Sequence, residues 1–362
     1  MAKHTPIEWT DSTWNPIGGC TRVSEGCRNC YAEIMAARFS GPGQWGEGLA
    51  HMVGNDHRWT GKLVLHEAAL DRPLRWREPR RIFVNSTSDL FHESVPDEWI
   101  DRVFAVMALA PQHTFQVLTK RSERMHAWFA QNRQLPIGDE MLAFSNEGRR
   151  IDLTNLVDAF GDEEEPNITP ICWPLPNVWL GTSIEDQPTA NTRIPHLLAT
   201  PAAVRFVSAE PLLGPVDLTL DGISCGPCPW CADSFPDPET GCVDCCRCDG
   251  TGKGDEVLLD WVIVGGESGP HARPMHPDWA RSLRDQCNAA RVPFFFKQWG
   301  EWGPDAGPRK NGGDPVMEGF APAAFYKGDE WHHYKSPYAI DPKEARGAGE
   351  WSYRLGKKRN GR

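Results

Sequence analysis

Short apolar runs recur along the chain, and each of them ends in a cluster of polar or charged residues. Such runs cover 81–84, 114–118, 178–180, 204–207, 261–264 and 293–296, with a weaker seventh at 62–65. Helix-like segments lie between them, for example 97–110, where Ile100, Val103 and Phe104 share one apolar face and Asp97 is placed to cap the helix. Strands that alternate with helices predict a parallel sheet.

The expected fold class is therefore α/β, with a parallel (β/α) barrel over residues 1–300. Both a partial and a full TIM barrel fit the pattern, because functional groups then gather at the carboxyl ends of the strands, where the polar clusters fall. An open doubly wound sheet places them on the same edge, so periodicity leaves that alternative open.

Length, charge and hydropathy exclude several classes. The 362 residues can bury a large core. The longest purely apolar stretch, 104–110, is far shorter than the ~20 residues of a membrane helix. The first residues also lack an apolar signal region, so we expect a cytoplasmic protein with no membrane partner. A net charge of −11 argues against a generally basic surface that coats nucleic acid, but it does not exclude a local basic groove.

Three cysteines, Cys20, Cys27 and Cys30, fall within eleven residues in the loop 14–33, with no fourth cysteine near. Cysteines in a chain without an export signal point to metal binding or catalysis. A structural zinc site uses four ligands, whereas three thiolates can hold a 4Fe-4S cluster with one open iron. The alternative is a zinc site completed by a distant residue such as His51 or His57.

This loop resembles a known family of enzymes. Asn15-Pro16, Gly19-Cys20 and Cys27-x-x-Cys30-Tyr31-Ala32 resemble the cluster loop of radical S-adenosylmethionine enzymes, especially the branch of spore photoproduct lyase. Downstream, 85–91 and 118–120 resemble two strand ends of that branch. The loop departs from the usual pattern in having six residues, not three, between its first two cysteines.

Over nearly its whole length the chain also resembles a phage and prophage family of uncharacterised proteins named for a three-cysteine motif. The shared segments are 83–92, 115–121, 207–212, 265–269 and 296–299. The resemblances together imply a radical-type barrel in which a reduced cluster cleaves S-adenosylmethionine and a hydrogen is abstracted from a substrate. They also imply a flavodoxin- or ferredoxin-like reductant and suggest a nucleic acid base as substrate.

The resemblance assigns roles to residues at the strand ends. Ser86, Ser88 and Asp89 are candidates for the methionine amine and Lys120 for the methionine carboxylate, with Ser183 and Glu185 reaching ribose hydroxyls or substrate. The remaining candidates are Asn29 and Tyr31 for cofactor binding, and Glu210, Glu267 and Lys297 for catalysis. In the structural alternative, Asp89 caps the next helix, Lys120 pairs with Glu210 across the barrel mouth, the serines satisfy turn backbone, and 265–267 is a plain glycine turn.

Four stretches interrupt or extend the alternation: 40–59, the acidic 136–176, the cysteine-rich 221–256, and an extension, 301–362, expected to pack on the barrel. In the insertion 221–256, two paired knuckles predict a zinc site on Cys228, Cys231, Cys245 and Cys248. Because three further thiols lie in the same insertion, an auxiliary iron-sulfur cluster is the alternative to zinc. Cys287, spaced by four from Leu283, is expected to be a buried helix residue, and Cys172 has no identifiable partner.

A second function class stays open on this evidence. Both cysteine clusters could be structural, in which case the chain is a non-catalytic metal-stabilised binding protein that acts with a phage-encoded or defence partner. That alternative predicts zinc at both sites and no cleavage of S-adenosylmethionine.

Overall fold

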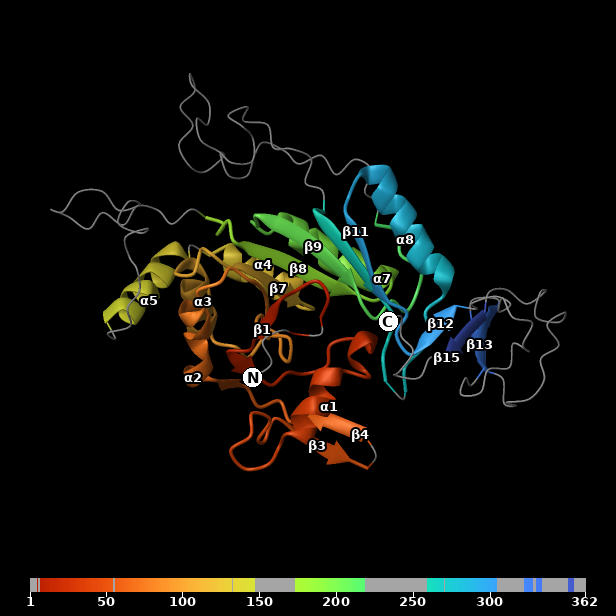
Figure 1. Cartoon of the computed structure of the whole chain (residues 1–362), viewed down its shortest axis with the longest axis horizontal. Helices are drawn as coiled ribbons and strands as arrows, with labels where there is room; N and C mark the ends of the chain where they lie inside the picture. Colours follow the sequence, from red (N-terminus) through yellow and green to blue (C-terminus); the bar gives the residue numbers. More distant parts are fainter. Residues whose placement is uncertain are drawn as a thin grey trace, which may run out of the picture.

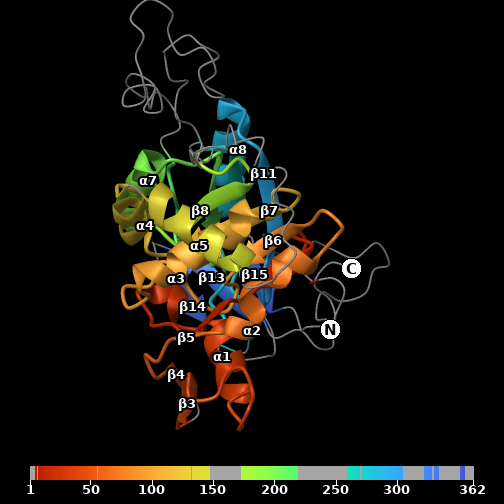
Figure 2. The same cartoon turned by 90° about the vertical axis from the view of Figure 1, so that its left-hand side faces the viewer.

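A seven-stranded parallel sheet forms the centre of the molecule and curls into a half-barrel (Figures 1 and 2). The computed structural model describes residues 5, 7–54, 56–131, 133–146, 173–218, 259–269, 271–304, 322–327, 330–333 and 351–354. The strand order runs from β1 at one edge to β11 at the other, in chain order. The strands are β1 (Ser12–Trp14), β6 (Arg81–Val84), β7 (Thr114–Thr119), β8 (Val178–Ile184), β9 (Val204–Ala209), β10 (Trp261–Gly265) and β11 (Phe294–Gln298). The fold class expected from the sequence is thus confirmed as a mixed α/β half-barrel.

Six of the seven apolar runs form strands of this sheet, but the seventh prediction is wrong. Residues 62–65 contribute only β5 (Val64–Leu65), which pairs antiparallel with β2 (Ile17–Gly18) outside the main sheet. The seventh strand is β1, which pairs with β6 through Thr13 and Phe83. Its sequence, Ser-Thr-Trp, contains no apolar run and therefore gave no signal.

Helices cover the outer face of the sheet. They are α2 (Glu67–Leu70), α3 (Asp97–Ala108), α4 (Ser122–Phe129), α5 (Gln134–Asn146), α7 (Gln187–Ala199) and α8 (Pro277–Ala290), with the 3-10 helix η2 (Arg72–Arg75). The apolar face of α3 packs with outward strand residues such as Val84 and Phe115 in one core. The prediction that Asp97 caps α3 is wrong. Pro96 is the N-cap, and the Asp97 carboxylate pairs with Arg124.

The inner face of the half-barrel is filled by aromatic residues near the amino ends of the strands. Trp9 lies 4.8 Å from Phe83 and 6.0 Å from Trp261, measured between ring centroids. Gly181 of β8 is required here, because a Cβ atom would lie 2.5 Å from the ring of Phe206. This packing fills the lumen at the amino ends of the strands and leaves the carboxyl ends for polar groups.

A smaller unit carries the cysteine loop and lies below the sheet in Figure 1. It consists of the 3-10 helix η1 (Glu25–Cys27), α1 (Tyr31–Arg38) and the antiparallel hairpin of β3 (Ala50–Val53) and β4 (Asp56–Trp59). The described part of the C-terminal extension forms an antiparallel sheet of β12 (Trp302–Pro304), β13 (Pro322–Lys327), β14 (Glu330–His333) and β15 (Trp351–Arg354). Across the described residues, every helix is too short or too polar to cross a membrane.

Candidate functional site

Polar side chains gather at the carboxyl edge of the sheet, on the same face of each strand as the aromatic residues of the lumen. In β8, Ser183 follows Trp179 and Gly181 on the lumen face, and it pairs in register with Ser208 of β9. Lys297 of β11 follows Phe295 in the same way. Because successive side chains of a strand alternate between faces, the residues after the aromatic layer also point into the lumen. The inner face thus changes from apolar to polar toward the carboxyl ends.

The loop of Cys20, Cys27 and Cys30 lies across this edge and is bound to several strand ends in turn. Its first anchor is the segment after β6, where Gly19 forms a parallel bridge with Ser88. Gly19 has φ +91°, and a Cβ atom there would lie 2.0 Å from the Lys62 carbonyl oxygen. Glycine is therefore the residue that lets the chain turn at this point and bring Cys20 to the sheet.

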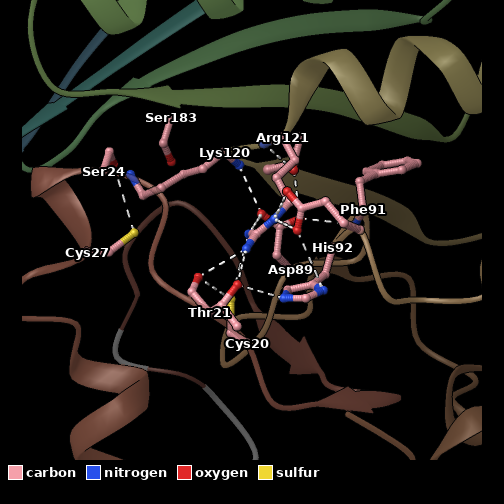
Figure 3. Close-up of polar contacts among 12 residues, drawn as sticks. Cys20, Thr21, Ser24, Cys27, Asp89, Phe91, His92, Lys120, Arg121 and Ser183 are labelled. Atoms are coloured by element: carbon pink, nitrogen blue, oxygen red, sulfur yellow. Dashed lines mark hydrogen bonds and ion pairs between the residues drawn. The ribbon is translucent and has the colours of Figure 1, made fainter. Parts of the chain in front are cut away.

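Arg121, two residues after the end of β7, holds the Cys20 end of the loop (Figure 3). Its Nη2 donates to the carbonyl and hydroxyl oxygens of Thr21, both at 3.0 Å. Nη1 donates to Asp89 Oδ2 at 3.0 Å and lies 3.8 Å from Cys20 Sγ, and Nε donates to Glu93. The guanidinium thus joins the loop to the segments after β6 and β7.

The Asp89 carboxylate accepts four hydrogen bonds from groups of the same chain. Oδ1 accepts from the Thr119 hydroxyl at 2.6 Å and from the Phe91 amide at 3.0 Å. Oδ2 accepts from Arg121 and from the Lys120 amide. A buried carboxylate with four donors is an ordering group for its neighbours.

Next along the loop, Ser24 binds Glu185 at the end of β8 and lies beside Cys27. Glu185 Oε1 accepts from the Ser24 hydroxyl at 2.8 Å and from Lys120 Nζ at 2.6 Å. Arg193 Nη1 donates to both carboxylate oxygens, at 3.1 and 3.2 Å. Ser24 Oγ lies 3.9 Å from Cys27 Sγ. Because the hydroxyl hydrogen of Ser24 goes to Glu185, the Cys27 thiol is the donor in that contact.

The Glu185 side chain is 1% exposed and ionised in this arrangement. Burial acts to raise the pKa of its carboxyl group, but Lys120 and Arg193 outweigh burial and hold the pKa below its ordinary value. The structural alternative considered from the sequence paired Lys120 with Glu210, whereas in the structure Lys120 pairs with Glu185.

Cys30 precedes α1, whose first turn is fixed by a buried glutamate. Glu33 Oε2 accepts from Arg22 Nε at 2.9 Å, and Oε1 accepts from the Trp59 amide at 2.7 Å, which joins α1 to the β3–β4 hairpin. Tyr31 extends the other way, and its hydroxyl donates to the Ser86 carbonyl. The loop is thus joined a second time to the segment after β6.

The segment after β10 holds the middle of the loop from the opposite side. Glu267 is buried and binds the Arg273 guanidinium at 2.7 and 2.9 Å. Arg273 Nη2 in turn donates to the Glu25 carbonyl oxygen at 2.8 Å, and Asn29 Nδ2 donates to the His271 carbonyl at 2.9 Å. Glu267 therefore faces Arg273, so its contact with the loop is indirect.

Glu210 and Lys297 form a pair at the ends of β9 and β11. Lys297 Nζ lies 2.6 Å from Glu210 Oε1, with side-chain exposures of 23% and 21%. The carboxyl group of Glu210 also lies close to Gly265, where a Cβ atom would be 3.1 Å from Cδ. This pair is more exposed than Asp89 or Glu185 and can meet a bound molecule.

The structure brings most of the predicted site residues to one edge. It also supplies residues that the sequence argument missed, namely Thr21, Ser24, Arg121, Arg193 and Arg273. Only Arg121 gave a signal, since it follows Lys120 in a segment shared with the resembled family. The predicted zinc ligands Cys228, Cys231, Cys245 and Cys248 lie outside the described residues, as does Cys172. Cys287 is buried in α8, as expected.

The chemistry of the three thiols suits a soft metal or an iron-sulfur cluster. Burial raises the pKa of Cys20 to about 12, with the Asp89 carboxylate adding to the rise and Arg121 opposing it. Burial also raises the pKa of Cys30, and Cys27 contributes to both shifts, so the three sulfurs influence one another. Within the described ranges, no three His, Cys, Asp or Glu side chains converge on a point that could hold a metal ion. The donor set of three thiols fits such a group.

Fold and site together define an α/β protein with a parallel half-barrel and a cysteine loop bound across its carboxyl edge. Residues 4–362 match the family model described as "Protein of unknown function (DUF5131)", and the chain belongs to this family. Comparison with curated proteins and with solved structures gave no match.

Proposed function

We propose that the protein is a radical S-adenosylmethionine-type enzyme whose cluster is held by Cys20, Cys27 and Cys30. The observation that carries this proposal is the position of the thiol loop, which is the loop 14–33 that carries the three cysteines. It contacts residues after β6, β7, β8 and β10, so its three sulfurs lie where a parallel barrel places its functional groups. When bound by three thiolates, a 4Fe-4S cluster supplies one open iron for the reductive cleavage of S-adenosylmethionine.

The surrounding side chains supply matching groups for the methionine part of that cofactor. The hydroxyls of Ser86 and Ser88 donate their hydrogens to Asn15 and to the Ile17 carbonyl, so their lone pairs can accept from an ammonium group. Lys120 uses one N–H on Glu185 and has two more for a carboxylate. In this assignment, Asp89 orders Arg121 and Thr119 and does not itself bind the amine.

Ser183, Glu185, Asn29 and Tyr31 complete the proposed cofactor side, while Glu210 and Lys297 face the substrate. Glu267 acts through Arg273 to hold the loop. Several aromatic rings fill the lumen below this ring of polar groups and exclude water from its floor. A water-poor floor suits radical chemistry, because a reactive intermediate must be kept from side reactions.

The proposed substrate is a nucleic acid base, and the proposed electron donor is a flavodoxin- or ferredoxin-like protein. Both follow from the resemblance of the loop to the spore photoproduct lyase branch. The net charge of −11 requires that nucleic acid be bound through a local surface and not through a generally basic one.

A non-catalytic metal-stabilised binding protein is the second candidate, and one observation favours it. Asp89, Glu185 and Glu267 each have strong partners within the protein, which is typical of groups that stabilise a loop. Under this alternative, zinc occupies the thiols, and the loop presents a surface to a phage-encoded or defence partner.

Anaerobic reconstitution separates the two. The protein is loaded with iron and sulfide, reduced in the presence of S-adenosylmethionine, and assayed for 5′-deoxyadenosine. We expect its formation by the wild type and by Cys287→Ala, whose cysteine lies in α8 away from the loop. We expect none from Cys27→Ala. A fully loaded wild-type cluster that produces no 5′-deoxyadenosine would overturn the radical proposal.

A further inference from the structure

We infer that Arg121 is the positioning residue for Cys20, holding its sulfur for metal binding through a charged N–H. The inference rests on the proposed function only in taking the three cysteines as metal ligands. The sequence marks Arg121 only as part of the shared segment 115–121, and its role follows from its contacts.

Every N–H group of the Arg121 guanidinium has an acceptor within reach. Nε donates to Glu93, Nη2 donates both hydrogens to Thr21, and Nη1 faces Asp89 Oδ2 and Cys20 Sγ. The guanidinium offers five donors in a fixed plane, so occupation of all five fixes its position as well as its charge. Because one of them is aimed at Cys20 Sγ, the sulfur is held relative to the sheet.

The anchor is rigid on the side of the protein body. The Arg121 side chain is 4% exposed, and the Asp89 carboxylate that orients it is held by Thr119. On the side of the loop, Thr21 Oγ1 also lies 2.8 Å from His92 Nε2. His92 Nδ1 accepts from the Ser94 amide, which leaves Nε2 as the donor to Thr21. The residue after Cys20 is therefore fixed from two directions.

The three thiols consequently have different supports. Cys20 lies beside a buried cation, whereas Cys27 lies beside the Ser24 hydroxyl and Cys30 precedes the first turn of α1. Groups that orient metal ligands from behind commonly contribute 10- to 100-fold to metal affinity, that is, about one to two orders of magnitude. Loss of Arg121 should therefore weaken metal binding through Cys20 in particular.

The test measures protection of individual thiols by Zn²⁺ alone, without iron, sulfide or S-adenosylmethionine. Reduced full-length protein is equilibrated with buffered Zn²⁺ and alkylated, and the peptides that carry Cys20, Cys27 and Cys30 are quantified separately by mass spectrometry. This peptide-level readout separates the loop from the cysteines of 221–256. For Arg121→Gln we expect half-protection at a Zn²⁺ concentration about 10- to 100-fold higher than for the wild type.

A double-mutant cycle distinguishes an effect through Cys20 from a general loss of structure. In a Cys20→Ser background, Arg121→Gln should cause little further loss of protection at Cys27 and Cys30. In a Cys27→Ser background, Arg121→Gln should reduce protection of the remaining thiols by the same factor as it does in the wild type. Arg124→Gln is the matched control, because it breaks an arginine–carboxylate pair between α4 and α3 that lies outside the loop, and it should leave protection unchanged.

Glu93→Gln provides a milder variant if Arg121→Gln does not fold, since the Glu93 side chain is 61% exposed. It should shift half-protection in the same direction by a smaller factor. Protection that is equal in wild type, Arg121→Gln and Glu93→Gln would overturn the inference and leave the radical proposal standing. Failure of Zn²⁺ to protect any of the three wild-type thiols would overturn the inference and count against the zinc-bound alternative, while the radical proposal is decided by the 5′-deoxyadenosine assay. A clear Arg121 effect without 5′-deoxyadenosine formation would support the inference and count against the radical proposal.

Discussion

A Cβ atom at Gly26 would lie 2.4 Å from both Cγ and Oε1 of Glu185, so the thiol loop crosses the end of β8 in direct backbone contact. The clash is purely steric, since φ of Gly26 lies outside the left-handed region. The contact explains how a loop of small and polar residues, with little apolar surface of its own, is held against the sheet.

Gly26→Ala should therefore displace the loop without straining its backbone. We expect a loss of about 1–3 kcal/mol in the free energy of unfolding, as in other overpacked sites, together with reduced metal content. Urea unfolding and metal analysis measure the two effects. Gly138→Ala in α5 is the control, because no atom lies within 4 Å of the added methyl group. Equal stability of Gly26→Ala and wild type would show that the loop is not seated on Glu185.

Glu185→Gln removes the anion shared by Lys120, Arg193 and Ser24. It should lower the free energy of unfolding at pH 7 by about 3 kcal/mol, because two largely buried cations lose their partner. The folded-state pKa of Glu185 lies below its ordinary value, so its stabilisation is present at neutral pH. That stabilisation is lost as the pH falls below the ordinary glutamate value of about 4.3 and through the lower pKa of the folded state.

The difference in stability between wild type and Glu185→Gln should accordingly narrow as the pH is lowered from 7 to about 3. Urea unfolding at a series of pH values measures it. Glu123→Gln, which changes an exposed carboxylate on α4, should show only a small difference throughout. A gap that stays constant with pH would mean that the ionised carboxylate is not what stabilises the site.

Arg273→Met should loosen the middle of the thiol loop while the sheet stays intact. It removes the link from Glu267 to the Glu25 carbonyl and leaves the buried Glu267 carboxylate without its cation. We expect a cost of about 1–3 kcal/mol and faster amide hydrogen exchange within 24–30. Arg281→Met, at an exposed pair with Asp278, should change neither. Unchanged exchange within 24–30 in Arg273→Met would show that the link does not order the loop.

The sheet could be predicted from the sequence because its strands are buried and read as continuous apolar runs. Val262, Ile263 and Val264 of β10 are an example, all with no exposed surface. Strand β1 lacks such a run, since Ser12, Thr13 and Trp14 form an edge strand whose identity depends on pairing with β6. A strand defined by its neighbour has no local signature.

The edge of the sheet could be predicted, but not the pairing of the charges along it. The structural alternative pairs Lys120 with Glu210, whereas the strand order brings it to Glu185, which follows the adjacent strand β8. Arg273 joins Glu25 across 248 positions of the chain, and spacing carries no information about such a contact. The contacts through which residues hold the loop are therefore found only when the fold is known.

Lys120 and Lys297 offer a matched pair for separating the two sides of the proposed site. Each Nζ lies 2.6 Å from a glutamate oxygen at a strand end, Glu185 for one and Glu210 for the other. Lys120 is assigned to the methionine carboxylate, whereas Lys297 is assigned to the substrate. If both assignments hold, removing the two charges should affect different kinetic parameters.

In the reconstituted protein, Lys120→Met should raise the KM for S-adenosylmethionine in 5′-deoxyadenosine formation. A lost charge-assisted hydrogen bond is worth about 1.5–3 kcal/mol, which corresponds to an increase of roughly 10- to 100-fold. Lys297→Met should leave that KM unchanged, because its charge faces the substrate and cleavage is assayed without one. Equal effects of the two variants on KM would contradict the division of the edge into a cofactor side at β6–β8 and a substrate side at β9–β11.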